Sequence, residues 1–265
     1  MTYCRILLLW LILGCIMPIG PVSAYFSPAL RDKARTLYKE GLALKREGHL
    51  QEARRCFAAA VARQQDFYEA HLELGHVYLL LDQPAAAREH YQQVLRRSSP
   101  LPDVFRGLAA ASYALGDYAA VPGYCERAAP GGNPPLWLLA GKSYFHLGQY
   151  DAAVAMLTLA VAHGAIPVSE VYLYLGMASL QLGDTAGGIA ELRKACAIQP
   201  CDTAILFQLA HACYQQGDYT AAVGYWQELL AILPEHAFAA YMLGKSYIGM
   251  GQTALGQSWC ERALQ

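Results

Sequence analysis

A glycine or aspartate recurs along the chain at a nearly constant spacing, and this spacing limits the fold more than any other feature. The successive gaps are 34, 34, 32, 35, 34 and 34 residues between Gly48, Asp82, Gly116, Gly148, Gly183, Gly217 and Gly251. A fixed period of about 20–50 residues is typical of repeat architectures, in which one small unit stacks on the next. The chain is therefore predicted to be a stack of about seven similar units.

The same residue types flank each of these positions. A small residue stands seven positions earlier, at Gly41, Gly75, Ala109, Gly141, Gly176, Ala210 and Gly244. A bulkier residue stands nine positions later, at Phe57, Tyr91, Cys125, Leu157, Leu192, Trp226 and Cys260. Small residues allow two helices to approach closely, and glycine at a helix end adopts the left-handed conformation that other residues resist. Each unit is therefore predicted to be two antiparallel helices joined by a tight turn.

The sequences at these positions resemble the tetratricopeptide repeat family. Leu74-Gly75-His76-Val77-Tyr78 and Leu243-Gly244-Lys245-Ser246-Tyr247 are similar to its first-helix signature, and Gly116-Asp117-Tyr118 and Gly217-Asp218-Tyr219 to its turn. The resemblance implies an all-α, right-handed superhelical solenoid of about seven antiparallel helical hairpins. It covers most of a predicted solenoid domain at residues 25–265, with repeats at about 34–67, 68–101, 102–133, 134–168, 169–202, 203–236 and 237–265.

The third repeat departs most from the pattern. Pro122 lies early in its second predicted helix, and the proline- and glycine-rich stretch 130–135 follows. Proline interrupts helical hydrogen bonding, so a kink or altered curvature is expected here, and a division into two sub-arrays is a further option. The alternative is a long loop between repeats with no functional meaning.

The first residues predict export. Arg5 precedes an apolar stretch at residues 6–17, and Val22-Ser23-Ala24 follows. This order is typical of a secretory signal peptide, here residues 1–24 with cleavage after Ala24. The protein is then periplasmic or secreted, in a bacterial cell envelope. An uncleaved membrane anchor, or a lipoprotein lipidated at Cys15, remains as an alternative, and only these two would attach the chain to a membrane.

The resemblance also implies which residues face a concave, partner-binding groove. First helices of successive hairpins line such a surface, and their inward positions here are strongly apolar and aromatic. Contiguous exposed apolar surface marks a binding site, whereas burial between tightly wound helices is the alternative. The predicted groove residues are Tyr38, Leu72, His76, Leu79, Arg106, Tyr113, Leu138, Lys142, Phe145, Leu173, Met177, Leu180, Phe207, His211, Tyr214, Tyr241, Lys245 and Ile248.

The net charge and the distribution of charged residues indicate which classes of partner the chain could attract. The net charge of −1 provides no general attraction to nucleic acid. Residues 31–63 carry nine basic and four acidic side chains, a difference of +5, which is either a patch for an anionic partner or an ordinary solvated surface. Some members of the family hold acidic chaperone peptides with Lys and Asn, but Tyr38 and Leu42 occupy two of those places, so that clamp is absent.

No motif for catalysis, for a metal ion or for a cofactor is present. The sequence contains no Gly-rich phosphate loop, no His-Glu-x-x-His helix and no Cys-x-x-Cys pair. His71 and His76 are five residues apart and share a helix face poorly. We therefore expect no enzymatic activity, no catalytic residue, no metal and no cofactor.

Six cysteines follow the predicted leader. Cys196, Cys201 and Cys213 surround one junction between hairpins, so one disulfide among them is conceivable in an oxidising compartment. Buried free thiols are the alternative.

These patterns favour a non-catalytic scaffold that holds a peptide or helix of a cell-envelope protein in its concave groove. The alternatives are a structural component that self-associates as a homo-oligomer, or a membrane-tethered lipoprotein that helps pilus, secretion or cytochrome assembly. The identity of the partner does not follow from the repeats, because one fold serves unrelated functions.

Overall fold

The computed structural model describes residues 28–96, 101–166 and 168–264. Within these residues the chain forms fourteen α-helices, one short 3₁₀ turn and no strand. The first helices of the hairpins are α2 (Pro28–Arg46), α4 (Tyr68–Leu80), α6 (Pro102–Ala114), α8 (Pro134–His146), α10 (Val168–Gln181), α12 (Thr203–Gln216) and α14 (Ala237–Gly249). The second helices are α3 (Leu50–Arg63), α5 (Pro84–Leu95), α7 (Val121–Ala128), α9 (Tyr150–Ala162), α11 (Thr185–Ile198), α13 (Tyr219–Ile232) and α15 (Thr253–Arg262).

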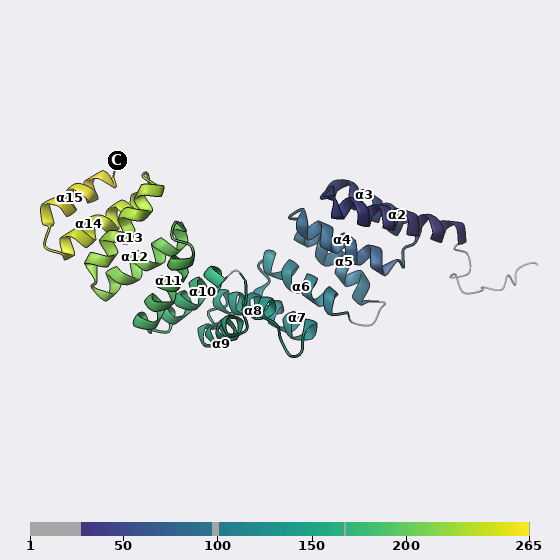
Figure 1. Ribbon diagram of the computed structural model, residues 1–265, viewed down its shortest axis with the longest axis horizontal. Helices are drawn as coiled ribbons and strands as arrows, with labels where there is room; N and C mark the ends of the chain where they lie inside the picture. The colour runs from purple at the N-terminus through teal and green to yellow at the C-terminus, as the bar shows by residue number, and fades with distance from the viewer. Residues whose placement is uncertain (1–27, 97–100, 167, 265) are drawn as a thin grey trace, which may run out of the picture. The chain divides into compact units, whose positions relative to one another are not determined.

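Within the first unit of the chain α2 packs on α3, and within the second unit the helices from α5 to α15 each pack on the next helix along the chain (Figure 1). The two helices of a hairpin pack more extensively on each other than on the following hairpin, as α10 does on α11 compared with α11 on α12. The first helices α6, α8, α10, α12 and α14 also contact one another in turn. The predicted all-α tetratricopeptide-type solenoid is confirmed. The predicted signal peptide at residues 1–24 lies outside the described residues.

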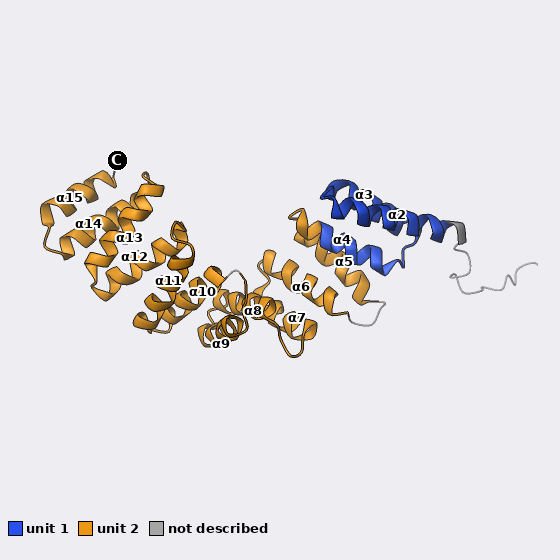
Figure 2. Cartoon of the chain, viewed as in Figure 1, with its two compact units in different colours: residues 1–77 blue, residues 78–265 orange. Residues whose placement is uncertain are grey.

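The chain divides into two compact units, Met1–Val77 and Tyr78–Gln265, and the boundary falls inside α4 (Figure 2). The division expected at the third repeat is wrong. The helices of that repeat, α6 and α7, both pack on α8, so the third and fourth repeats belong to one unit.

Every turn residue that sets the period has a left-handed backbone. The φ angles are +84° at Gly48, +56° at Asp82 and between +71° and +85° at the five later glycines. Among the described residues Asp82 is the only one other than glycine with a positive φ. The left-handed conformation is strained for residues with a Cβ atom and easily adopted by glycine. This is the physical reason why the sequence period is marked by glycine.

The small residues of the pattern lie where the two helices of a hairpin meet. Gly176 of α10 faces Gly188 of α11, and a Cβ atom on Gly176 would lie 2.9 Å from the carbonyl oxygen of Gly188. The bulky residues fill the core between helices, and Phe57, Tyr91, Leu157, Leu192 and Trp226 are all fully buried. Burial of these side chains stabilises each hairpin against its neighbours.

The third repeat has a short second helix rather than a kinked one. A 3₁₀ turn at Tyr118–Ala120 precedes α7, which has eight residues where α9 has thirteen. Pro122 lies in the first turn of α7, where a missing N–H breaks no helical hydrogen bond. After the 130–133 loop, Asn133 Oδ1 accepts a hydrogen bond of 3.0 Å from the Leu136 N–H and begins α8.

None of the helices in the described part of the chain combines the length and the hydrophobicity needed to cross a membrane.

Candidate partner-binding surface

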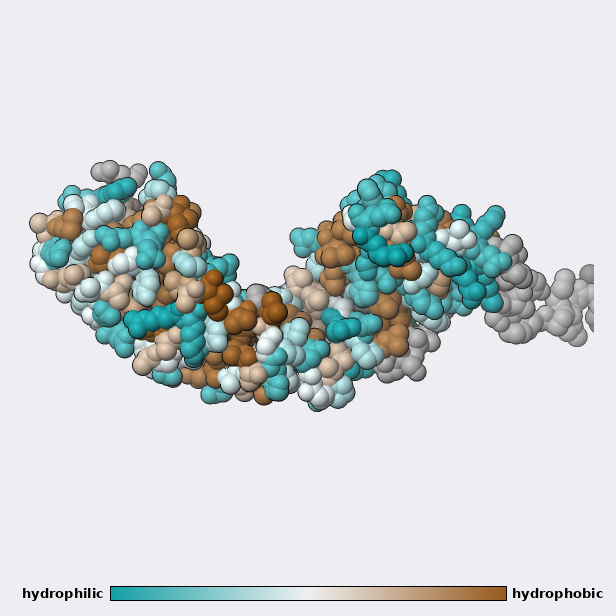
Figure 3. Space-filling model, viewed as in Figure 1, coloured by the Kyte–Doolittle hydropathy of each residue, from teal (hydrophilic) through white to brown (hydrophobic). Residues whose placement is uncertain are grey.

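The predicted groove residues form a surface on the first helices that is partly open to solvent. All but one are half-buried or exposed, although most are apolar or aromatic. Arg106, Tyr241 and Ile248 are the exposed ones, and Arg106 forms an ion pair with Asp103. We call the part of this surface on α6, α8, α10, α12 and α14 the first-helix wall of the second unit. In Figure 3 hydrophobic residues gather over the middle of this unit, around α8 and α10.

Leu138 is the exception, and its assignment to the groove is wrong. Its side chain is only 6% exposed and belongs to the same buried cluster as Leu157 of α9 and Val171 of α10. The side of α8 that carries Leu138 meets these neighbouring helices, so no partner can reach it.

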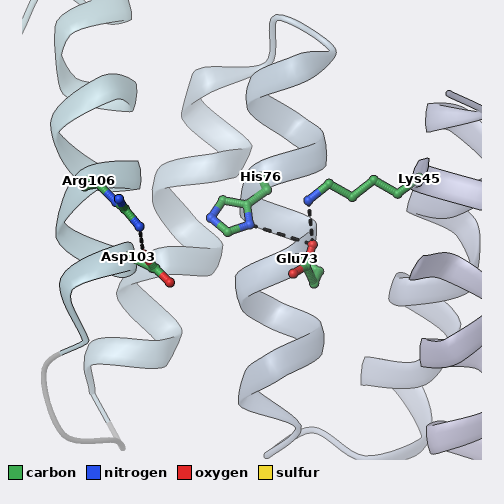
Figure 4. A network of polar contacts seen from close by, with 5 residues as sticks. All are labelled: Lys45, Glu73, His76, Asp103 and Arg106. Carbon is green, nitrogen blue, oxygen red and sulfur yellow. Dashed lines mark hydrogen bonds and ion pairs between the residues drawn. The ribbon is translucent and has the colours of Figure 1, made fainter. Parts of the chain in front are cut away.

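In the first unit a carboxylate joins two hairpins. Glu73 Oε2 of α4 lies 2.7 Å from Lys45 Nζ of α2 and 3.7 Å from His76 Nδ1, one turn along its own helix (Figure 4). The contacts with His76 and Lys45 lower the pKa of Glu73 to about 2, against the opposing effect of burial. Tyr38 packs beside this network against Phe57 and Phe67, with ring centroids 5.8 and 5.1 Å away. These contacts fill much of the first unit's predicted groove with the chain's own side chains.

In the second unit, aromatic rings from three first helices form a cluster on the wall. His146 of α8 stacks on Tyr118 at 4.4 Å, and its Nε2 lies 3.3 Å from the hydroxyl oxygen of Tyr113 on α6. Phe145 packs edge-on against Tyr174 of α10 at 5.5 Å. Burial raises the pKa values of Tyr113 and Tyr174 and lowers that of His146, so all three are neutral near pH 7.

Lys142 lies at the centre of this aromatic cluster. Its Nζ is 2.6 Å from Glu170 Oε1 on α10, 4.8 Å from the Tyr113 ring and 5.4 Å from the Tyr174 ring. Aromatic faces attract a cation, and the carboxylate neutralises it. The ammonium group of Lys142 is therefore already paired with a carboxylate and two aromatic rings of the chain itself.

The far end of the wall, on α12 and α14, combines aromatic and basic side chains. Phe207 contacts the buried Trp226 at 5.4 Å and Phe238 at 5.7 Å, and His211 stacks on Phe207 at 6.3 Å. Phe238 and Tyr241 of α14 are nearly half exposed. Because Phe207 also supports the core at Trp226, the exposed rings are better suited to contact a partner.

A cavity opens beside the short helix α7. It measures about 400 Å³ and is lined mainly by apolar residues of α7, α8, α9 and the loop between α7 and α8, among them Cys125, Trp137 and Met156. Burial raises the pKa of the Cys125 thiol to about 12, so this thiol is protonated and a poor nucleophile at pH 7.

The three cysteines considered for a disulfide are free thiols in this structure. Cys213 is fully buried in α12, whereas Cys196 is half-buried and Cys201 is exposed in the loop before α12. The disulfide considered among these three cysteines is therefore not formed in this structure.

The described residues contain no group of three His, Cys, Asp or Glu side chains that could hold a metal ion. The histidines have other contacts. His71 is buried with its Nε2 3.2 Å from the carbonyl oxygen of Gln65, and His76 contacts Glu73. What this surface provides is apolar, aromatic and cationic contact area.

Several residues of the wall were missed by the sequence analysis. Tyr118 lies in a turn, Phe238 lies in the first turn of α14, and His146 and Tyr174 lie beside the predicted inward rows. The sequence offered a clue to one of these residues, because His146 directly follows Phe145, which was predicted to face the groove. The contact between Tyr113 of α6 and His146 of α8 depends on how far one hairpin is offset from the next, and the repeat period does not specify that offset.

Family models for the tetratricopeptide repeat match residues 38–102 and 138–202, and a second model of the same repeat matches residues 203–236. The chain belongs to the tetratricopeptide repeat family. Proteins with such repeats are generally non-catalytic scaffolds for protein–protein interaction. No curated protein matches the chain.

Solved tetratricopeptide repeat structures share this fold. The MamA protein is 20% identical, with a TM-score of 0.57, over 62% of this chain and 90% of MamA. A tetratricopeptide repeat protein from Parabacteroides merdae is 14% identical, with a TM-score of 0.63, over 88% and 92%. A chain of the APC/C hetero-tetramer Cut9-Hcn1 is 19% identical, with a TM-score of 0.63, over 81% of this chain and 42% of that one. At these identities the likeness concerns the fold alone.

Proposed function

We propose that the protein is a non-catalytic scaffold that holds a peptide or a helix of another protein on the first-helix wall of its second unit. The observation that carries the proposal is the accessibility of apolar and aromatic side chains on that wall, such as Tyr241 at 44% exposed. Accessible aromatic side chains with adjacent cations are the usual anchors of protein interfaces. The structural similarity to a chain of the Cut9-Hcn1 complex supports a protein as the partner.

The cellular location in this proposal rests on the sequence. The basic, apolar and small-residue order of residues 1–24 is that of a signal peptide. It supports a role in a bacterial cell envelope, with the partner in the periplasm or outside the cell. N-terminal sequencing of the protein purified from cells tests this part, and a chain that begins at Tyr25 is the expected result.

The test of the wall replaces two of its exposed side chains. Tyr241→Ala together with Ile248→Ala removes apolar area from one face of α14, where both side chains are exposed. Losing two interface anchors costs about 2–4 kcal/mol of binding free energy. We expect recovery of partners crosslinked in native cells to fall at least tenfold, with the circular dichroism spectrum unchanged.

The matched control is Ile232→Ala. Ile232 lies on the second helix α13 and is as exposed as Ile248, at 42% compared with 37%. This variant should recover partners at the wild-type level. Undiminished recovery by the double variant would remove the wall as the binding surface.

Self-association is a second candidate function. Helix α15 buries only Gly256 and leaves Leu255 and Leu264 exposed. Exposed apolar surface often marks an interface, so a second copy of the chain is a candidate partner for this surface.

A further inference from the structure

The first helices of the last four hairpins carry an uneven charge. Helices α8, α12 and α14 contain no aspartate or glutamate, and α10 contains only Glu170. The same helices carry two lysines, Lys142 and Lys245, and two histidines, His146 and His211. Their basic side chains therefore outnumber their carboxylates.

These four side chains differ in whether they already have partners within the chain. Glu170 already neutralises Lys142 at 2.6 Å, and His146 is held by Tyr113 and Tyr118. Lys245 of α14, in contrast, forms no hydrogen bond or ion pair with any residue that the structure describes. The cationic group left without a counterion is therefore at the α12–α14 end of the wall.

Four carboxylates close in sequence to this end lie in turns or on a second helix. Asp202 Oδ1 accepts hydrogen bonds from the N–H groups of Ala204 and Ile205 and caps α12. Asp218 Oδ1 accepts one from the N–H of Ala221 and caps α13. Glu235 lies in the exposed loop before α14, and Glu228 is exposed on the second helix α13. None of the four lies on a first helix.

Exposed aromatic rings occur on the same helix as this lysine. Phe238 and Tyr241 precede Lys245 on α14 by about two turns and one turn, and both are nearly half exposed. On α12, His211 stacks on Phe207, which in turn contacts Phe238. An apolar segment that covered these rings would bring its own charged side chains close to Lys245.

We propose that the α12–α14 end of the wall binds an acidic amphipathic segment, whose apolar side chains cover Phe238 and Tyr241 and whose carboxylate pairs with Lys245. This inference rests on the proposed function and adds the charge of the partner to it. A lysine partly removed from water gains from a carboxylate partner, whereas a basic segment placed there is repelled. The occupant is therefore a protein segment rich in Asp or Glu and not a basic one.

The test uses two synthetic helical peptides of about 16 residues, with the Leu and Phe spacing of a groove-binding helix. They are identical except that every charged position is Glu in one and Lys in the other. Fluorescence anisotropy measures their binding to the full chain at low and at high salt. We expect the Glu peptide to bind about tenfold more tightly than the Lys peptide at low salt, and the difference to shrink at high salt.

Two substitutions of Lys245 decide whether this residue sets the preference. Lys245→Gln should weaken binding of the Glu peptide about fivefold, and Lys245→Glu should invert the order of the two peptides. Lys194→Gln is the control, because Lys194 is exposed on the second helix α11 and pairs with Glu191 there. It should change neither affinity.

The proposal is overturned if wild-type protein binds the two peptides equally, if it binds neither, or if Lys245→Glu keeps the order unchanged. If the wild type binds both peptides equally, and the double variant Tyr241→Ala with Ile248→Ala binds neither, the acidic partner is rejected but the wall remains the binding surface. Unchanged capture of native partners by that double variant would instead reject the proposed function itself.

Discussion

At the scale of single residues, the fold depends on positions where a side chain would be too large. A Cβ atom on Gly176 would lie 2.7 Å from Leu192 Cγ and 2.9 Å from a backbone oxygen of the facing helix. The same is true of Gly244, where the nearest backbone oxygen would lie at 2.6 Å. Backbone atoms cannot move aside as a flexible side chain can, so these glycines fix the distance between the helices of a hairpin.

Gly176→Ala should therefore destabilise the protein. Forcing a methyl group into this contact costs about 1–3 kcal/mol, which outweighs the gain in helix propensity. The measurement is the urea midpoint of unfolding followed by circular dichroism, which should fall.

Gly224→Ala is the matched comparison. Gly224 also lies within a helix, α13, but a Cβ atom there would meet nothing within 4 Å. Alanine in place of glycine in an open helical position stabilises by about 0.5–1 kcal/mol. The two alanine variants should therefore shift the midpoint in opposite directions, and a shift in the same direction would contradict the contact.

Single residues were also what the sequence predicted best. The seven turn residues and the small residues before them follow from steric limits on the backbone, which act locally and leave a direct trace in the sequence. Cys260 shows the limit of this reasoning. It holds the position that is buried in the other repeats, yet it is only half-buried, because no further hairpin among the described residues covers α15.

At the scale of helices, the ion pair between α2 and α4 links the stability of the first unit to pH. The contacts of Glu73 with His76 and Lys45 lower its pKa from an ordinary 4.5 to about 2. A carboxyl group whose pKa is lower in the folded state stabilises the fold fully above its unfolded pKa, and loses this effect as the pH falls towards the folded value. The contribution should thus be present above about pH 4.5 and disappear between about pH 4.5 and 2.

Glu73→Gln tests this link. The variant should melt at a lower temperature than wild type at pH 7, and the difference should vanish as the pH approaches 2. Thermal melting followed by circular dichroism from pH 2 to pH 7 provides the comparison. Glu69→Gln, one turn earlier on the exposed side of α4, should follow the wild-type profile. If both variants behave alike, the contacts of Glu73 do not carry the effect.

The sequence predicted the helices and the face that each presents, but not how side chains meet across hairpins. Helical periodicity identifies one face of α8, and Lys142 and Phe145 on it are half-buried. Leu138 on the same predicted face is buried, because it packs with residues of α9 and α10. The aromatic cluster around His146 likewise depends on the packing of α6, α8 and α10, to which residues far apart in sequence contribute.

At the scale of the whole molecule, the exposed end of the second unit predicts self-association. Leu264 is 87% exposed beside α15, which buries little of its own surface. If two copies meet at this end, light scattering of the wild type should give a mass that rises with concentration. Leu264→Lys should then remain monomeric over the same range, because a charged group there is costly to bury.

Ile166→Lys is the control for this experiment. Ile166 is 80% exposed in the loop between α9 and α10, away from α15. It should associate as the wild type does. A wild type whose mass stays constant at all concentrations, or a Leu264→Lys variant that still associates, would eliminate this end as a self-association surface.

The close backbone contacts inside the hairpins have a mechanical consequence. Gly176 with Gly188, and Gly244 with Gly256, hold the two helices of one hairpin together, and the packing between successive hairpins is less extensive. Under tension applied to the chain, the hairpins should part from one another before any of them opens. Each hairpin then behaves as a rigid segment, and the second unit stretches mainly at the contacts between successive hairpins.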